Sequence, residues 1–195
     1  MKRILAALLV FVSLCSGYAR EPQRGYRGFF EWDNSLGSMP YFDHSVGEDK
    51  NDFQWIFGCS TAHGYQINKN VFVGAGLLFA FGAPSLECTL PVFFDFRYDH
   101  SFGKFRPFGD LRIGYNLTDG GGVYFSPTIG YRFDWGRKVG LNLGIGLTLR
   151  GRTSDVYRLD LVQGTYPDNP HFEFVDLGRK HYADAFFTFR IGIDF

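Results

Sequence analysis

Apolar and polar side chains alternate with a period of two from residue 26 onward, and helical periodicity is nearly absent. Residues 138–150 are the clearest case, because Val, Leu or Ile occupies every odd position from 139 to 149. Such alternation predicts strands with one apolar and one polar face. Eight segments follow the pattern: 26–33, 53–65, 71–81, 89–98, 105–117, 123–133, 138–150 and 182–195.

The connections between these segments differ in length. We expect tight turns at 66–70, 99–104 and 134–137, and short connections at 82–88 and 118–122. Long surface loops are expected at about 34–52 and 151–181. Tight turns on one side and the longest loops on the other are typical of outer-membrane barrels. The last loop alternates on both sides of its turn-rich centre, which fits either a hairpin that extends the last two strands or a mobile coil.

Eight alternating strands fit a closed barrel, either in a membrane or soluble in the manner of a lipocalin. Here the apolar face is bulky and aromatic, whereas the other face is rich in Gly, Ser and Thr and carries charges of both signs. The narrow interior of eight strands suits small residues. We therefore predict an all-β, eight-stranded antiparallel up-and-down transmembrane β-barrel; the soluble barrel, with its aromatic face inside, is the alternative.

The start of the chain is typical of a secretory signal peptide. Met1, Lys2 and Arg3 are followed by an apolar run over 4–12, and the segment ends Gly17-Tyr18-Ala19. We expect residues 1–19 to be removed and 20–195 to form the barrel domain. The predicted location is the cell outer membrane, as an integral protein with both termini in the periplasm.

Composition excludes several classes of protein. The chain carries 20 basic and 20 acidic residues, which argues against a nucleic-acid binder, and its hydrophobic content of 45% is too high for a disordered chain. No cofactor is predicted. Cys59 and Cys88 fall on different strands at different heights, so we predict free thiols rather than a disulfide.

Charged residues on the polar face predict a network inside the barrel. Asp95 is expected beside Arg112 or one step away, and Arg97 beside Asp110, across the turn at 99–104. Paired charges offset each other's desolvation, so we interpret the network as a structural plug; a proton or ion path is the alternative. Its predicted members are Arg27, Glu31, Asp95, Arg97, Asp110, Arg112, Arg132 and Arg190.

Two further groups on the apolar face point to a membrane. Aromatic residues near strand ends are expected to form interfacial girdles. The alternation that ends at the terminal Phe is the pattern read by the barrel-assembly machinery. The girdle residues are Trp32, Trp55, Tyr65, Tyr98 and Trp135, and the assembly signal is Phe187, Phe189, Ile191, Ile193 and Phe195.

Four segments carry a family resemblance: 61–68 (TAHGYQIN), 74–76 (GAG), 90–98 (LPVFFDFRY) and 130–133 (GYRF). With them, essentially the whole mature chain resembles the small outer-membrane β-barrel family of Gram-negative bacteria, in particular the Bacteroides-type barrel-domain proteins. The fold is similar to the membrane domain of OmpA and to OmpX. The resemblance implies a fold and implies almost nothing about activity.

Three groups of residues are candidates for chemistry. His63 is expected on the aromatic face near the periplasmic interface, in an interfacial role rather than as a catalyst or ligand. The first loop holds Asp43, His44, Glu48, Asp49 and Asp52, which fit either a cation site or a solvated acidic loop. A lipid-modifying enzyme would need a nucleophile, a His and an acid at the outer rim, where Ser154, His171, Glu173 and His181 lie without a compact triad signature.

We therefore expect a non-enzymatic anchor whose loops serve adhesion, host contact or envelope stability. The expected partners are outer-membrane lipid, lipopolysaccharide, the barrel-assembly machinery and an extracellular surface partner, with no nucleic acid. Pro91 and Pro127 each remove a ladder donor and suggest a bulge or a weakened seam. A lateral opening there for small hydrophobic solutes is the alternative function, and a lipid-modifying enzyme is the less favoured one.

Overall fold

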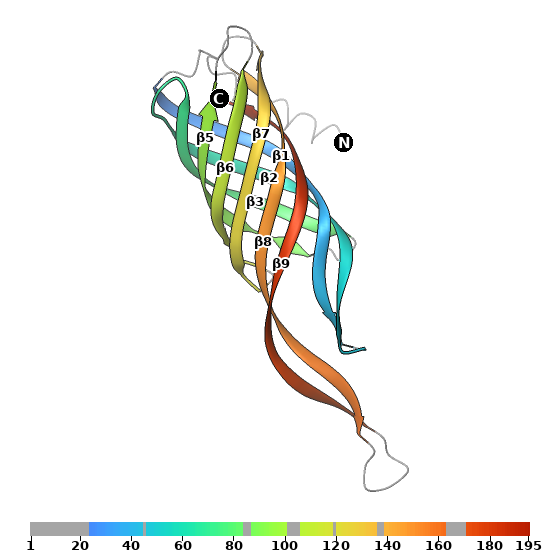
Figure 1. Cartoon of the computed structure of the whole chain (residues 1–195). Coiled ribbons are helices and arrows are strands. Elements are labelled where there is room, and N and C mark those ends of the chain that lie inside the picture. The colour runs from blue at the N-terminus through green and yellow to red at the C-terminus, as the bar shows by residue number, and fades with distance from the viewer. Residues whose placement is uncertain are drawn as a thin grey trace, which may run out of the picture.

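The computed structural model describes residues 24–44, 46–83, 87–100, 106–118, 120–135, 139–162 and 171–195. All its strands belong to one antiparallel sheet, and pairing of β2 with β3 closes that sheet into a ring of eight strands (Figure 1). β4 and β5 both pair with β3 and together form one strand of the ring. The strands are β1 Gly25–Asp43, β2 Glu48–Gln66, β3 Val71–Ala83, β4 Cys88–Thr89, β5 Pro91–Asp99, β6 Pro107–Asn116, β7 Gly122–Trp135, β8 Val139–Val162 and β9 His171–Asp194.

The predicted eight-strand antiparallel arrangement is confirmed. Each long strand pairs with its neighbour in sequence. The first and last strands, β1 and β9, are joined by ten residue pairs from Phe29↔Asp194 to Ser38↔Ala185. Beyond β9, Phe195 continues the pairing, because its N–H donates to the Gly28 carbonyl (3.0 Å) and its carbonyl accepts from the Gly28 N–H (2.9 Å). The described part of the chain contains no helix long and apolar enough to cross a membrane.

The prediction of a surface loop at 34–52 is wrong. These residues continue β1 and β2, which stay paired from Asn34↔Phe57 to Asp43↔Glu48. The turn is tight, since Gly47 adopts a positive φ of 78° and its N–H donates to the Asp43 carbonyl (2.8 Å). Many residues of this segment are polar, so the hydrophobic pattern did not indicate the extended strand pair that it forms.

The loop predicted at 151–181 is a hairpin, one of the two readings left open. β8 and β9 stay paired from Gly151↔Ala183 to Val162↔His171, and the turn-rich centre at 163–170 lies outside the described residues. One extra residue, Leu177, shifts the register between Val156 and Tyr157. Gly178 beside it has a positive φ of 86°, which bends the strand as bulges do.

Both prolines interrupt a ladder, but neither produces the expected bulge. Across Pro127 the β7–β8 pairs Phe125↔Leu149 and Thr128↔Gly146 keep one register, although the residues between them form no ladder pair. At Pro91, the first residue of β5, the gap from β4 is Leu90 alone, and the register on β3 is unchanged. The missing proline N–H therefore weakens pairing without inserting a residue.

The ring has two unlike ends. The first hairpin tip (residues 39–52) and the last hairpin (the β8–β9 extension beyond Arg150 and Asp184) project from one end, as Figure 1 shows. The C-terminus lies at the other end, where β2, β5 and β7 end. We call it the short-turn end, because few residues separate each of these strands from the next. The signal peptide predicted at 1–19 lies outside the described residues.

Candidate functional site

The ring is apolar outside and charged inside. β5 alternates without exception between buried and exposed residues: Phe94 is 75% exposed, whereas the neighbouring Asp95 is 2% exposed. Large apolar side chains are exposed along every long strand, including Leu77, Ile129 and Leu147. This distribution is the reverse of a water-soluble barrel, in which apolar side chains fill the interior.

The interior holds equal numbers of opposite charges. Among the described residues, seven arginines and seven carboxylates are buried. All eight predicted members of the network belong to this set. The other six were not predicted as members: Asp33, Asp99, Arg150, Arg152, Asp184 and Asp194.

At the short-turn end, the Asp194 carboxylate is in contact with two interior arginines and with Asn142. Arg132 donates to both of its carboxylate oxygens (2.9 and 3.0 Å), and Asn142 donates to one (2.9 Å). Arg27 lies 3.2 Å from Asp194 and also pairs with Asp99. This carboxylate therefore ties β9 to β1, β7 and β8.

Close packing around Asp194 depends on a glycine. A Cβ added at Gly140 would lie 2.2 Å from Asp194 Oδ1 and 2.4 Å from Arg132 Nε. A Cβ added at Gly109, by contrast, would meet open space. Gly140 therefore leaves the room that the Arg132–Asp194 pair occupies.

A second cluster fills the middle of the ring. Arg190 donates to Asp33 (2.6 Å) and to Asp110 (2.7 Å). Arg112 pairs with Glu31 and lies 3.4 Å from Asp110. The cluster therefore joins β1, β6 and β9 through the interior.

The predicted cross-strand neighbours are confirmed, since Asp95 pairs with Arg112 and Arg97 with Asp110 in the β5–β6 register. The shortest ion pair of Arg112, however, is formed with a residue on another strand. Arg112 Nε is 3.9 Å from Asp95, while its terminal nitrogen contacts Glu31 on β1. Long side chains in a narrow ring reach across the interior, which register alone does not predict.

A third cluster lies at the hairpin end. Arg150 pairs with Asp184 (2.8 Å) and donates to Thr89 (2.7 Å). Arg152 lies 3.9 Å from Asp184 and donates to the Pro40 carbonyl (2.6 Å). These three residues were not predicted as members of the network: Arg152 lies beyond the expected end of the seventh strand at 150, whereas Arg150 and Asp184 lie on the polar face of expected strands.

Phenylalanine rings lie between the interior charges. The Arg97 guanidinium lies 3.6 Å from the Phe108 centroid and 4.7 Å from that of Phe29, and Arg112 lies 4.8 Å from Phe93. Such stacking stabilises a desolvated cation. The expectation that mainly small residues face inward was therefore incomplete.

Little space is left in the described part of the interior that lies between two of the clusters. The cavity between the middle and hairpin-end clusters has a volume of about 20 Å³, lined by Tyr124, Phe186, Arg150 and their neighbours. That is room for about one water molecule. A cavity of this size fits the predicted structural plug better than an ion path.

The four predicted girdle residues whose side chains are described point outward, although not all of them lie at strand ends. Tyr65 and Tyr98 are exposed at the short-turn end, and Trp55 is exposed ten residues from Tyr65 on β2. Trp32 is exposed too, but its predicted place at a strand end is wrong, because β1 is longer than expected. The side chain of Trp135 lies outside the described part.

The C-terminal residues of the predicted assembly signal line one face of β9. Phe187, Phe189 and Ile191 are exposed, and Ile193 and Phe195 are half-buried. They face outward with the rest of the apolar surface.

His63 lies on the outer face beside the chain terminus. The Tyr26 hydroxyl lies 2.6 Å from its Nδ1, and the Thr61 hydroxyl lies 2.8 Å from its Nε2. Thr61 itself donates to the Phe29 carbonyl (3.1 Å), so it accepts from His63. In the neutral imidazole this arrangement places the proton on Nε2, and Nδ1 then accepts from the Tyr26 hydroxyl. The position of His63 is consistent with the expected interfacial role.

The acidic residues of the first hairpin tip are engaged by other groups. Asp43 pairs with Lys50 (2.5 Å), Asp49 with Lys180 (3.0 Å), and Asp52 accepts from a backbone N–H. Within the described residues, no group of three or more His, Cys, Asp or Glu side chains could hold a metal ion. The cation site weighed for this segment is therefore not assembled here.

The two hairpins contact each other directly. Asp49 accepts from Lys180 and from the Tyr182 hydroxyl (3.0 Å each), and these hydrogen bonds, that of Lys180 first, hold the pKa of Asp49 below its usual range. The His44 ring stacks on Tyr157 at 4.0 Å. The first hairpin tip therefore braces the base of the last hairpin.

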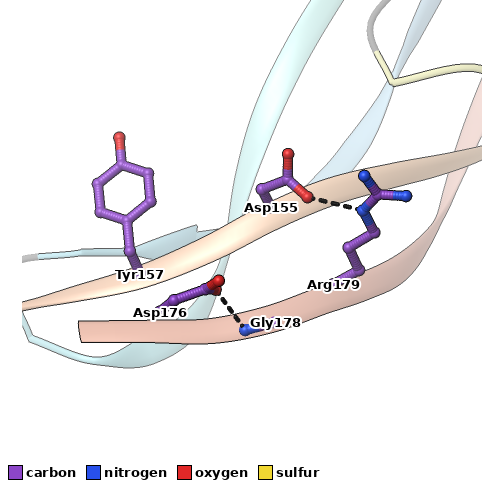
Figure 2. Close-up of a pocket in the computed structure, with 5 residues that line it drawn as sticks. All are labelled: Asp155, Tyr157, Asp176, Gly178 and Arg179. Carbon is purple, nitrogen blue, oxygen red and sulfur yellow. Dashed lines mark hydrogen bonds and ion pairs between the residues drawn. The ribbon is translucent and has the colours of Figure 1, made fainter. Parts of the chain in front are cut away.

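The bulge creates an open pocket of about 770 Å³ on the last hairpin. Figure 2 shows its lining: Arg179 pairs with Asp155 (2.9 Å), and Asp176 accepts from the Gly178 N–H (2.7 Å), with Tyr157 beside them. Asp155 and Arg179 are both 75% exposed. This pocket is open to solvent, and its Asp155 and Arg179 side chains already pair with each other.

The candidate enzyme residues do not converge in the described structure. The Ser154 hydroxyl donates to the next residue's carbonyl (3.4 Å), and His181 Nδ1 lies 3.0 Å from the Thr153 hydroxyl. The side chains of His171 and Glu173 lie outside the described part. Cys59 and Cys88 are free, as predicted.

Comparison with known proteins gives no match: no family model, no curated protein and no solved structure matches this chain. The resemblance to outer-membrane barrels therefore remains a prediction.

Proposed function

We propose that the chain is an integral outer-membrane β-barrel protein of the small family that its sequence resembles. It serves as a non-enzymatic anchor that presents the two hairpins for envelope stability or adhesion. Its partners are membrane lipid, lipopolysaccharide, the barrel-assembly machinery and an extracellular surface partner.

The observation that carries this proposal is the inverted distribution of side chains. A water-soluble protein rarely exposes apolar patches larger than a few hundred Å². Here exposed Phe, Leu, Ile and Val residues surround the whole ring, while the buried residues include seven arginines. An outer surface of apolar side chains is favourable in hydrocarbon. Buried arginines are tolerable when they pair with buried carboxylates.

The spacing of exposed aromatic residues fits a bilayer. Trp55 and Tyr65 lie ten residues apart on β2, about 33 Å along a strand that rises about 3.3 Å per residue. At a tilt of about 35–45°, that separation becomes about 23–27 Å along the barrel axis, close to the apolar band of about 25 Å in such proteins.

The ends of the ring support one orientation. Bacterial outer-membrane barrels have short periplasmic turns and longer extracellular loops. The short turns and the C-terminus therefore face the periplasm, and both hairpins face outward from the cell. A signal peptide at 1–19 delivers the chain, and the outward-facing apolar residues of β9 serve as the assembly signal.

Transport of small hydrophobic solutes is the second candidate, because the β7–β8 ladder is interrupted at Pro127. The interior behind that seam is charged, since Ser126 contacts Arg190 (2.5 Å). A cavity of about 20 Å³ accepts no such solute. The anchor remains the better-supported function.

Cell fractionation with gel electrophoresis tests the proposal. The protein should sediment with the outer membrane, and its mobility should differ between boiled and unboiled samples, because a folded barrel resists detergent. An unshifted band in the periplasmic fraction would contradict it.

A further inference from the structure

The two hairpins enclose a cleft of about 510 Å³ at the end of the ring opposite the C-terminus. This volume lies in the range of about 300–1,000 Å³ common for small-molecule sites. The first hairpin tip supplies one wall and the base of the last hairpin supplies the other. We call it the hairpin cleft; its lining is Tyr41, Phe42, Asp43, His44, Arg152, Ser154 and Tyr182.

Neighbouring side chains hold two of the aromatic rings of the cleft, those of Tyr182 and Phe42, in place. The Tyr182 hydroxyl donates to Asp49, and the Arg152 guanidinium lies 5.6 Å from the Tyr182 centroid. The Lys180 ammonium lies 4.8 Å from the Phe42 centroid. Rings fixed in this way lose little conformational entropy when a ligand binds.

The lining of the cleft carries one acidic and one basic side chain, Asp43 and Arg152. Asp43 pairs with Lys50 (2.5 Å), and Arg152 lies 3.9 Å from Asp184. The cleft therefore offers hydrogen-bonding groups without a net charge, which disfavours a phosphate or a metal ion as its occupant.

We propose that the hairpin cleft binds a neutral carbohydrate. A pyranose ring has an apolar C–H face that packs on an aromatic ring and a rim of hydroxyls that both donate and accept. Tyr41 and Tyr182 supply the accessible rings, whereas Phe42 is buried in the wall of the cleft. Carboxylate, guanidinium and hydroxyl groups beside them supply the complementary hydrogen bonds. This inference rests on the proposed function and deepens it, because it makes a glycan the surface partner.

Binding is measured on full-length folded protein in lauryldimethylamine oxide, a detergent without a sugar headgroup. The probes are maltose, cellobiose, lactose and diacetylchitobiose, followed by saturation-transfer NMR and calorimetry. At least one should bind saturably, and Tyr41→Ala should weaken its binding about tenfold, the loss of about 1.4 kcal/mol of ring contact. Tyr115→Ala, an exposed tyrosine on the outside of β6, is the matched control and should bind as wild type.

Three results would overturn the inference: no probe binds, Tyr41→Ala binds as tightly as wild type, or a sulfated disaccharide binds while the neutral ones do not. The gel shift on boiling, run on the same samples, separates the two proposals. A heat-shifted protein that binds no sugar refutes the carbohydrate site alone, whereas a protein without the shift counts against the barrel.

Discussion

Replacing Arg190 by methionine leaves two carboxylates inside the ring without a main partner. Arg190 donates to Asp33 at 2.6 Å and to Asp110 at 2.7 Å, and all three side chains are buried. Methionine fills similar space and carries no charge. The substitution therefore tests whether the buried network is a structural plug that holds the strands together.

The expected loss follows from what each carboxylate retains. Asp33 keeps a hydrogen bond from Ser60 (2.5 Å), and Asp110 keeps Arg112 at 3.4 Å. The cost should therefore be about 3 kcal/mol, at the low end of the roughly 3–5 kcal/mol lost when a buried pair is broken. With a urea slope of about 3 kcal/mol/M, the unfolding midpoint falls by about 1 M.

The assay is urea unfolding in lipid vesicles, followed by the gel-mobility shift. Arg179→Met, which breaks an Arg–Asp pair that is 75% exposed, is the matched control and should leave the midpoint unchanged. Adding Asp33→Asn and Asp110→Asn to Arg190→Met should restore most of the loss. A midpoint equal to wild type for Arg190→Met alone would refute the reasoning.

Three other predictions follow from single contacts. Gly140→Ala should lower the temperature of the gel-mobility transition, at a cost of about 1–3 kcal/mol for overpacking, while Gly109→Ala leaves it unchanged; equal transitions would contradict the packing. The contact of Asp49 with Lys180 should persist above pH 4 and weaken as the pH falls through the lowered pKa of that carboxyl, exposing the first hairpin to acid protease; Asp49→Asn should remove that pH dependence, and resistance at low pH in the wild type would refute it. At pH 8, ¹⁵N NMR should find the proton of the His63 imidazole on Nε2; a proton on Nδ1 would contradict the assigned hydrogen bonds.

Period-two patterning was sufficient to predict the ring. Each strand has one environment on each side, so parity assigns residues such as Phe94 and Asp95 to opposite faces. The turn at 99–104 was also sufficient to place Asp95 beside Arg112. The register of neighbouring strands can be predicted from local sequence when a short connection joins them.

Contacts across the interior could not be predicted in the same way. The Arg112–Glu31 and Arg190–Asp110 pairs join strands far apart in sequence, and their geometry depends on tilt and closure of the whole ring. The strand continuation at 34–52 was missed because its residues are polar. Asp49 there is stabilised by contact with the last hairpin, which no local pattern records.

The central claim is that the aromatic face of the ring lies in hydrocarbon. Trp32, in the middle of β1 and exposed on that face, reports on it directly. A variant that keeps this tryptophan and carries Trp55→Phe and Trp135→Phe is folded into vesicles of lipids brominated on the acyl chains. The account predicts strong quenching of its fluorescence relative to unbrominated vesicles; equal fluorescence in the two would contradict the account.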